Sequence, residues 1–302
     1  MQKIIPHLWF DTQAKEAADF YVSVFPDAKI VSSVVIPDTP SGDCDFITFN
    51  VSGQDFMALS AGPDFTLNPS VSFMVNFDPS HDDQAEAHLR ELWDKLSDGG
   101  SALMPLDAYP YSKLYGWVKD KFGITWQLIL TNPDGEPRPF IVPSLMFSGE
   151  HVNQAEDAMK FYIETFKDAK VGTVARYPEA TGPAKKDALM FADFTLAGQW
   201  FAAMDSGVEQ DFTFNEAISL LVNCETQTEI DELWGKLSAV PEAEQCGWLK
   251  DKFGVVWQIS SAEMDTMFRE GTPAQVKAMT KAFMPMKKIE IAPIKAAYDS
   301  AK

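Results

Sequence analysis

The chain carries an internal repeat, and this repeat limits the folds open to it more than any other feature of the sequence. Residues 20–30 (FYVSVFPDAKI) recur as residues 161–171 (FYIETFKDAKV), with six of eleven positions identical. Residues 116–128 (GWVKDKFGITWQL) recur as residues 247–259 (GWLKDKFGVVWQI), with nine of thirteen positions identical. Two more matches follow the same order: residues 64–76 with 211–223, and residues 91–97 with 232–238. Because the matches are collinear and widely spaced, they indicate a duplicated domain and not a short-period solenoid.

The boundary between the two copies lies at a segment rich in proline and glycine. Residues 131–140 (TNPDGEPRPF) contain three prolines and one glycine, which is typical of a linker. The segment IIPHLWF that opens the first copy returns directly after it as IVPSLMF. The sequence therefore predicts four parts: a first domain over residues 1–132, a linker over 133–140, a second domain over 141–262 and a C-terminal helical extension over 263–302.

Each copy alternates strand-like and helix-like patterns in the order β-α-β-β-β, and does so twice. Apolar residues recur with a period of about 3.6 over residues 13–25, which indicates an amphipathic helix. The other predicted elements of the first copy are strands over 4–10, 29–36, 46–51, 55–60, 71–77, 102–106, 116–119 and 125–130, and a helix over 82–96. The fold class predicted by this order is α+β.

Composition excludes several classes of protein. With 46% hydrophobic and 23% charged residues, the chain is not a disordered segment, a collagen or a small disulfide scaffold. Its formal charge of −19 leaves no broad basic face for nucleic acid. Cys44, Cys224 and Cys246 are too scattered for a disulfide framework, so we expect free thiols and a cytoplasmic location. No secretory signal opens the chain and no stretch reaches about 18 apolar residues, so we expect no membrane partner.

The predicted extension differs in charge from the rest of the chain. Residues 272–302 carry six lysines and two acidic residues, a net charge of +4 in a chain of −19. A predicted helix places Val276, Met279 and Phe283 on one apolar face. We expect this positive tail to dock on the acidic body of the same chain.

Three motifs recur in both copies. P-x-L-x-F opens each copy, A-x-x-F-Y lies on its first helix, and G-W-[VL]-K-D-K-F-G-x-x-W-Q closes it. With these motifs in a repeated β-α-β-β-β pattern, the chain resembles the PhnB-like branch of the vicinal oxygen chelate superfamily, which includes glyoxalase I, extradiol dioxygenases and bleomycin resistance proteins. The resemblance implies tandem glyoxalase-like domains, each with two β-α-β-β-β halves that form a curved mixed sheet around a pocket.

Members of this branch are often described as 3-demethylubiquinone-9 3-methyltransferases. A methyltransferase of that kind needs a strand, a glycine-rich turn and a helix to hold its nucleoside cofactor. No G-x-G segment follows a predicted strand in this chain, so we expect no such cofactor.

The resemblance also implies where a metal would be held. In metal-using relatives, His, Gln or Glu ligands come from the first, fourth, fifth and eighth strands, and the segment DFMALS on the fourth offers none here. The other three positions fall, in the two copies, on His7 and Ser144, on Ser72 and Ser219, and on Gln127 and Gln258. Hydroxyls and neutral amides are poor ligands for Zn²⁺, Mn²⁺, Ni²⁺ or Fe²⁺, because they do not compensate the ion's charge. We therefore expect a degenerate metal site and no cofactor. A divalent metal at His7 and Gln127 is the alternative.

Aromatic residues complete the predicted ligand pocket. Trp9 shares a strand face with His7, because residues two apart point to the same side of a sheet. Tyr111 and Tyr115 belong to an aromatic, acidic cluster that the second copy lacks, and Trp117 follows on the same segment. If only one copy binds a ligand, this cluster favours the first.

Two functions of different classes remain open. In the first, the chain is a small-molecule binding protein whose acidic body favours a cationic, partly aromatic ligand. In the second, the first domain is a metal-dependent lyase, isomerase or dioxygenase that acts through His7 and Gln127. Single-domain relatives pair as dimers, so the resemblance further implies an intramolecular pseudo-dimer of the two domains.

Overall fold

The computed structural model of the chain describes residues 2–39 and 41–301, and it has an α+β fold with two mixed sheets of seven and eight strands. The predicted fold class is confirmed. The chain divides into two compact units. Unit 1 comprises the described residues within 1–22, 28–66 and 214–302, and unit 2 comprises residues 23–27 and 67–213.

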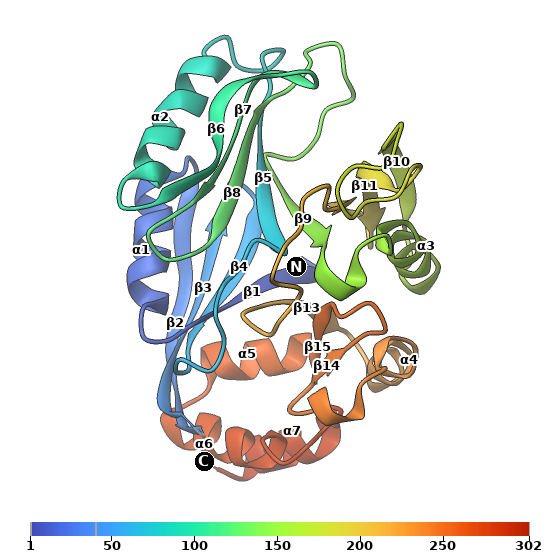
Figure 1. Cartoon of the computed structure of the whole chain (residues 1–302). Coiled ribbons are helices and arrows are strands. Elements are labelled where there is room, and N and C mark those ends of the chain that lie inside the picture. The colour runs from blue at the N-terminus through green and yellow to red at the C-terminus, as the bar shows by residue number, and fades with distance from the viewer. Residues whose placement is uncertain (1, 40, 302) are drawn as a thin grey trace. The chain divides into compact units, whose positions relative to one another are not determined.

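Unit 1 is built on the seven-stranded sheet, in which β1 is the middle strand (Figure 1). β1 pairs with β13 in antiparallel and with β4 in parallel orientation, and all its residues except Trp9 are buried. From one edge to the other the strands are β14 (Trp248–Lys250), β15 (Val256–Ser261), β13 (Ile218–Cys224), β1 (Ile4–Phe10), β4 (Gln54–Ser60), β3 (Gly42–Val51) and β2 (Ala28–Thr39). The helix α4 (Gln227–Leu237) packs against β13 and β15, and a short 3₁₀ helix spans Pro241–Ala243. The helix α1 (Ala14–Val24) buries Tyr21, whose ring stacks on Phe49 at 5.9 Å.

Unit 2 is built on the eight-stranded sheet. There β5 pairs with β8 in parallel and with β9 in antiparallel orientation. The strands in order are β10 (Lys170–Arg176), β11 (Leu189–Leu196), β12 (Gln199–Asp205), β9 (Ile141–Phe147), β5 (Val71–Phe77), β8 (Thr125–Leu130), β7 (Ser112–Lys119) and β6 (Ser101–Tyr109). The helix α2 (Ala85–Ser97) packs against β5 to β8, α3 (Ala155–Thr165) packs against β11 and β12, and a 3₁₀ helix spans Gly149–His151.

Each sheet combines two halves that come from different sequence repeats. Three of the four halves have the predicted β-α-β-β-β order, whereas the second half of the second repeat is β-α-β-β, with a 3₁₀ helix at Pro241–Ala243 in place of one strand. Unit 1 joins the first half of the first repeat to the second half of the second repeat, and unit 2 joins the remaining halves. The linker explains this exchange. The N–H of Thr131 donates to Phe77 O at 2.9 Å and the N–H of Asn76 donates to Phe140 O at 2.8 Å, so the chain crosses the end of β5 and starts β9 on the free edge of that strand. Because the linker is short, the first half of the second repeat is added to the sheet that the second half of the first repeat has formed.

The repeated K-D-K-F-G segment has a structural role in both copies. The buried carboxylate of Asp120 accepts two backbone N–H groups of the following turn and, at 2.8 Å, the indole N–H of Trp126. Asp251 makes the same set of hydrogen bonds, including one of 2.8 Å from the indole of Trp257. Both tryptophans are at most 1% exposed. The motif therefore fixes the turn before the last strand of each repeat and anchors a large core side chain.

The C-terminal extension forms three helices in unit 1, drawn in red and orange in Figure 1. They are α5 (Ala262–Glu270), α6 (Pro273–Phe283) and α7 (Ile291–Ser300). The sequence did not predict α5. In α6, which packs against β2, the predicted apolar face of Val276, Met279 and Phe283 is buried.

The positive charge of the extension is matched by acidic residues of unit 1. Lys287 Nζ lies 3.0 Å from Glu244 Oε2, and Lys288 pairs with Asp231 on α4. The prediction that the tail docks on the acidic body of its own chain is confirmed. No helix in the described part of the chain is long and apolar enough to cross a membrane.

Candidate ligand-binding site

Unit 1 contains a cavity of about 480 Å³ between its sheet and the C-terminal helices. The walls are mostly apolar. Six aromatic side chains line the cavity: Trp9, Phe46, Phe65, Trp248, Phe268 and Phe283. Met264, Met284 and two of these aromatic residues belong to the extension, which therefore supplies a whole wall. A cavity of this size and lining fits a small organic molecule.

The sheet brings four of the predicted site residues together, and three of them, His7, Trp9 and Gln258, line this cavity. Alternate residues of β1 point to it, so His7 and Trp9 both line it. His7 is the register partner of Ser219 on β13 and of Met57 on β4. Gln258 on β15 joins them, because its Nε2 donates to Ser219 Oγ at 2.9 Å.

His7 is a buried, neutral imidazole. Its side chain is 2% exposed, and burial lowers the pKa of the ring to about 4. The ring meets Trp248 edge-on, with 5.6 Å between the ring centres. Nδ1 has no hydrogen-bond partner among the described residues. Since a neutral imidazole has one donor and one acceptor nitrogen, His7 can hydrogen-bond a molecule in the cavity without a charge of its own.

The two copies satisfy the glutamine of their W-Q motif differently. In unit 2, Gln127 Nε2 donates to Ser72 Oγ at 2.6 Å, and Gln127 Oε1 accepts the hydroxyl of Tyr115 at 2.7 Å. In unit 1, Gln258 likewise donates to its serine, but Cys246 stands in the place of Tyr115. Within residues 2–39 and 41–301 no donor reaches Gln258 Oε1. The cavity therefore has a free carbonyl oxygen where unit 2 has a completed hydrogen bond.

A pair of asparagines shows the same contrast. Asn76 Nδ2 donates to Pro139 O at 2.8 Å in unit 2. Its counterpart Asn223 is 3% exposed and lines the cavity, and neither of its side-chain amide atoms has a partner among the described residues. Buried amides are normally hydrogen-bonded, because an unpaired one costs about 1–3 kcal/mol. An unpaired amide in the wall of a cavity therefore marks a point of contact for a ligand.

The remaining predicted site residues lie in unit 2. Ser144 is the register partner of Ser72, and both are at most 1% exposed. Trp117 is half-buried and is the register partner of Gln127. None of these residues lines the cavity of unit 1.

The tyrosine cluster that favoured the first copy also lies in unit 2. Tyr111 is 57% exposed, and its ring centre is 5.3 Å from that of Tyr115. Burial, with a smaller effect of Tyr109, raises the pKa of Tyr111 to about 12. Burial raises the pKa of Tyr115 further still. Both phenols are neutral at pH 7, and that of Tyr115 is a structural partner of Gln127.

His7 and Gln127 belong to different sheets. β1, which carries His7, lies in the seven-stranded sheet, and β8, which carries Gln127, lies in the eight-stranded sheet. The two halves of the first copy therefore do not form the single sheet that the resemblance implied. The reason is that β5 pairs with β9 of the second repeat, so the two halves of the first repeat do not share a sheet.

The donor set of the cavity does not fit a divalent metal. The side chains at the four positions named by the resemblance are those of His7, Met57, Ser219 and Gln258. One imidazole, a thioether, a hydroxyl and a neutral amide provide neither negative charge nor three strong ligands for a divalent ion. In the described part of the chain, no three His, Cys, Asp or Glu side chains are grouped to hold a metal ion.

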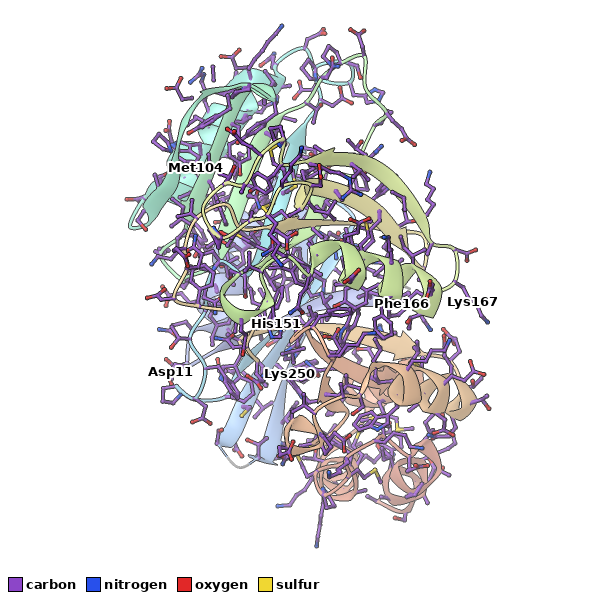
Figure 2. The ribbon with its side chains drawn as sticks, turned by 45° about the vertical axis from the view of Figure 1, so that its right-hand side comes forward. Asp11, Met104, His151, Phe166, Lys167 and Lys250 are labelled. Atoms are coloured by element: carbon purple, nitrogen blue, oxygen red, sulfur yellow. The ribbon has the colours of Figure 1, made fainter. Side chains whose placement is uncertain are left out.

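The charges that line the cavity are all negative. Among the described lining residues the charged ones are Asp64, Glu216, Glu242 and Asp265, and none is a lysine or arginine. Glu216 Oε1 lies 3.1 Å from Nζ of Lys250, which is labelled in Figure 2 at the end of β14. The field in the cavity therefore favours a cation.

Cys246 connects the extension to the cavity and is not a nucleophile. Its Sγ donates to Met284 O at 3.0 Å, and its N–H donates to Met286 O at 2.7 Å. Burial raises the pKa of the thiol to about 11. Because the thiolate is the reactive form, this cysteine is inert at neutral pH.

Sequence reasoning missed Asn223 and the residues of the extension. Asn223 is identical to Asn76 in the repeat, so no local signal separates the paired residue from the unpaired one. Asp265 and Phe268 lie on the unpredicted helix α5. Ser261, which caps α5 by accepting the N–H of Glu263, is the signal that could have located this helix.

Comparison with known proteins identifies both repeats. The family model described as 3-demethylubiquinone-9 3-methyltransferase matches residues 2–129 and 139–260. These two matches leave out the extension. No curated protein matches the chain significantly.

Three solved structures are similar to part or most of the chain. The PhnB protein from Bacillus cereus is 35% identical over 43% of this chain and 100% of its own, with a TM-score of 0.38. Glyoxalase I from Zea mays is 11% identical over 89% of this chain and 98% of its own, with a TM-score of 0.54. A candidate dioxygenase from Bacillus subtilis subsp. subtilis str. 168 is 10% identical over 98% of this chain and 95% of its own, with a TM-score of 0.50. The last two show that the chain has the glyoxalase-type fold.

Proposed function

The chain belongs to the 3-demethylubiquinone-9 3-methyltransferase family and carries its PhnB-like domain twice. We propose that it is a small-molecule binding protein of the vicinal oxygen chelate fold and that unit 1 binds the ligand. The ligand has an aromatic or apolar body and a positive charge, and no metal takes part in holding it. Methyl transfer, which the family description names, needs a nucleoside site, and no G-x-G segment after a strand offers one.

One observation carries this proposal: a glutamine and an asparagine are hydrogen-bonded in unit 2, whereas their equivalents in unit 1 have free polar atoms in the wall of the cavity. Gln127 and Asn76 have their hydrogen bonds completed by Tyr115 and by the linker. Both amide atoms of Asn223 are buried without a partner among the described residues. In the same part of the chain Gln258 has only the side-chain hydrogen bond that its Nε2 donates to Ser219 Oγ, and both side chains line the cavity. Unit 2 also has unpaired buried atoms, among them Ser144 Oγ and Trp117 Nε1, but the glutamine and asparagine pairs differ between the units. This difference supports a binding role for unit 1 and a structural role for unit 2.

The chemistry of the ligand follows from the other lining residues. Trp9 lies edge-on to Phe65 at 5.0 Å and to Trp248 at 6.1 Å, which leaves large apolar and π surfaces along the wall. Aromatic faces attract cations as well as flat apolar molecules. The four lining carboxylates select against anions.

The same proposal includes an intramolecular pseudo-dimer. Each sheet takes one half from each repeat, so one chain supplies what two single-domain chains would exchange. Size-exclusion chromatography with light scattering should give a monomer of 33.6 kDa. An obligate dimer of full-length chains would contradict this part of the proposal.

Calorimetric titration with three naphthalene compounds tests the binding function. The compounds are 2-naphthylmethylamine, 2-naphthylmethanol and 2-naphthoate, which share a ring and differ in charge. We expect binding to weaken from the cation to the alcohol to the anion. Gln258→Leu should weaken binding, whereas Gln127→Leu, the matched change in unit 2, should leave it unchanged.

Two results would contradict the proposal. The first is that none of the three compounds binds, or that the two glutamine variants lose affinity equally. The second is one tightly bound divalent ion per chain in protein purified without chelator, lost on His7→Ala, since this would restore the metal-dependent alternative.

A further inference from the structure

Three polar side chains line the cavity where β15 passes into α5. Asn223 on β13 and Ser260 on β15 are register partners on adjacent parallel strands, and Asp265 lies in the first turns of α5. They differ from the aromatic walls in having oxygen acceptors: one amide carbonyl, one hydroxyl and one carboxylate. The family match ends at residue 260, so Asp265 lies outside the matched part of the chain.

Asn223 points to a missing partner at this place. It is 97% buried, and both its amide oxygen and its amide nitrogen lack a hydrogen bond in the described chain. The equivalent amide nitrogen in unit 2 is satisfied by a linker carbonyl, so the position itself does not demand an unpaired amide. A native structure keeps such a group unpaired only where something else satisfies it or where it serves a function.

Asp265 is a carboxylate withheld from water. Its side chain is 14% exposed, and burial raises its pKa, against the opposing charge of Arg269 and with a small contribution from Asp55. Its ion pair with Arg269 is long, with 3.4 Å between Nε and Oδ2. A half-buried acid with one weak counter-ion is stabilised when a second cation enters the cavity beside it.

We propose that Asp265, Asn223 and Ser260 form the head-group subsite of the cavity and that they take a hydrogen-bond-donating cation, a primary ammonium or an amidinium, whose aromatic body lies against Trp9 and Trp248. This inference rests on the proposed binding function and deepens it. The three oxygen atoms accept the N–H donors of the head group, and the charge of Asp265 is neutralised by it. A quaternary ammonium has no N–H donors, so it leaves Asn223 unpaired and does not fit this subsite.

The extension therefore sets the specificity of the site. The sheet supplies Asn223 and Ser260, but the carboxylate comes only with α5. Phe268 on the same helix packs against the buried cluster of Ile5, Met57 and Leu221 on the sheet, which fixes α5 at the cavity. Asp265 thus has a defined position and is not a mobile surface acid.

Isothermal titration calorimetry of the full-length chain tests this assignment with three probes of one ring system. The probes are 2-naphthylmethylamine, its N,N,N-trimethylammonium derivative and 2-naphthylmethanol. The variants are Asp265→Asn, which keeps the shape of the side chain and removes its charge, and Asn223→Leu. Glu270→Gln is the matched control, because it removes the same charge from the exposed end of the same helix.

The wild-type chain should bind the primary amine at least about tenfold more tightly than the other two probes, a difference of about 1.4 kcal/mol. Asp265→Asn and Asn223→Leu should each remove that preference, whereas Glu270→Gln should keep it. Equal affinity for the primary and the quaternary amine, or an unchanged preference in Asp265→Asn, would overturn the subsite and leave the binding function standing. Failure of all three probes to bind would instead overturn the binding function, and the subsite with it.

Discussion

Replacement of Asn223 by leucine should make the protein more stable. Leucine has the same branching and the same number of side-chain heavy atoms as asparagine but no polar atoms, so Asn223→Leu removes an amide that is 3% exposed and has no partner in the described chain. Burial of an unpaired amide costs about 1–3 kcal/mol, so we expect the free energy of unfolding to rise by about that amount. The matched change in unit 2, Asn76→Leu, should lower it by about 1 kcal/mol, because it breaks the hydrogen bond to Pro139.

Equilibrium unfolding in urea, followed by circular dichroism, measures both changes. With a slope of about 3 kcal/mol per molar urea, the midpoint for Asn223→Leu should rise by about 0.3–1 M, with the slope itself unchanged. The same variant should lose affinity for the primary amine. A gain in stability together with a loss of binding is the result expected when a polar group is kept for function.

A fall in stability for Asn223→Leu would refute this reasoning. It would mean that Asn223 is already hydrogen-bonded inside the protein, and the contrast between the two copies would lose its meaning. Equal losses in the two asparagine variants would lead to the same conclusion. A midpoint that rises while binding persists would show that Asn223 is unpaired but does not contact the ligand.

Three further predictions concern single residues. The pKa of His7 is about 4 in the fold against 6.5 in the unfolded chain, so the wild type loses stability as the pH falls from 6.5 towards 4. Between pH 7.5 and pH 5, His7→Gln should therefore lose about 2 kcal/mol less free energy of unfolding than the wild type, as measured by urea unfolding. Equal losses in the two proteins would show that His7 is not shielded from protons. Tyr115→Phe should lower the thermal midpoint through a loss of about 1–3 kcal/mol, because Gln127 Oε1 is left buried without a donor; an unchanged midpoint would mean that this hydrogen bond contributes nothing. Asp251→Asn should lower the free energy of unfolding in urea by about 2–3 kcal/mol, because it replaces one of the two acceptor oxygens by an NH₂ group, which is itself a donor and cannot accept the indole N–H of Trp257. A loss below about 1 kcal/mol would contradict the structural role of the motif.

Local patterns in the sequence predicted most elements of the fold, because each depends on residues close together in the chain. The period of apolar residues located α1, and the K-D-K-F-G segment located the turn around Asp120 and Asp251. The predicted apolar face of α6 is buried as expected, but α5 was missed because it is a short helix of nine residues with only two buried positions, Met264 and Met267. In the candidate site, the sequence located His7, Ser219 and Gln258 because they fall on the ligand positions that the resemblance implies, and Trp9 because it shares a strand face with His7.

The sequence by itself determined that the domain is duplicated, that β-α-β-β-β halves recur along the chain, and that a positive tail follows an acidic body. Only the tertiary structure decided which halves share a sheet, which of the two repeated asparagines is unpaired, and which part of the chain closes the cavity. The pairing of β1 with β13 joins residues that are more than two hundred positions apart, and no local pattern encodes such a register. For the same reason Asn76 and Asn223 are indistinguishable in the sequence, and only the presence of a linker carbonyl beside one of them makes the other a place where a ligand can bind.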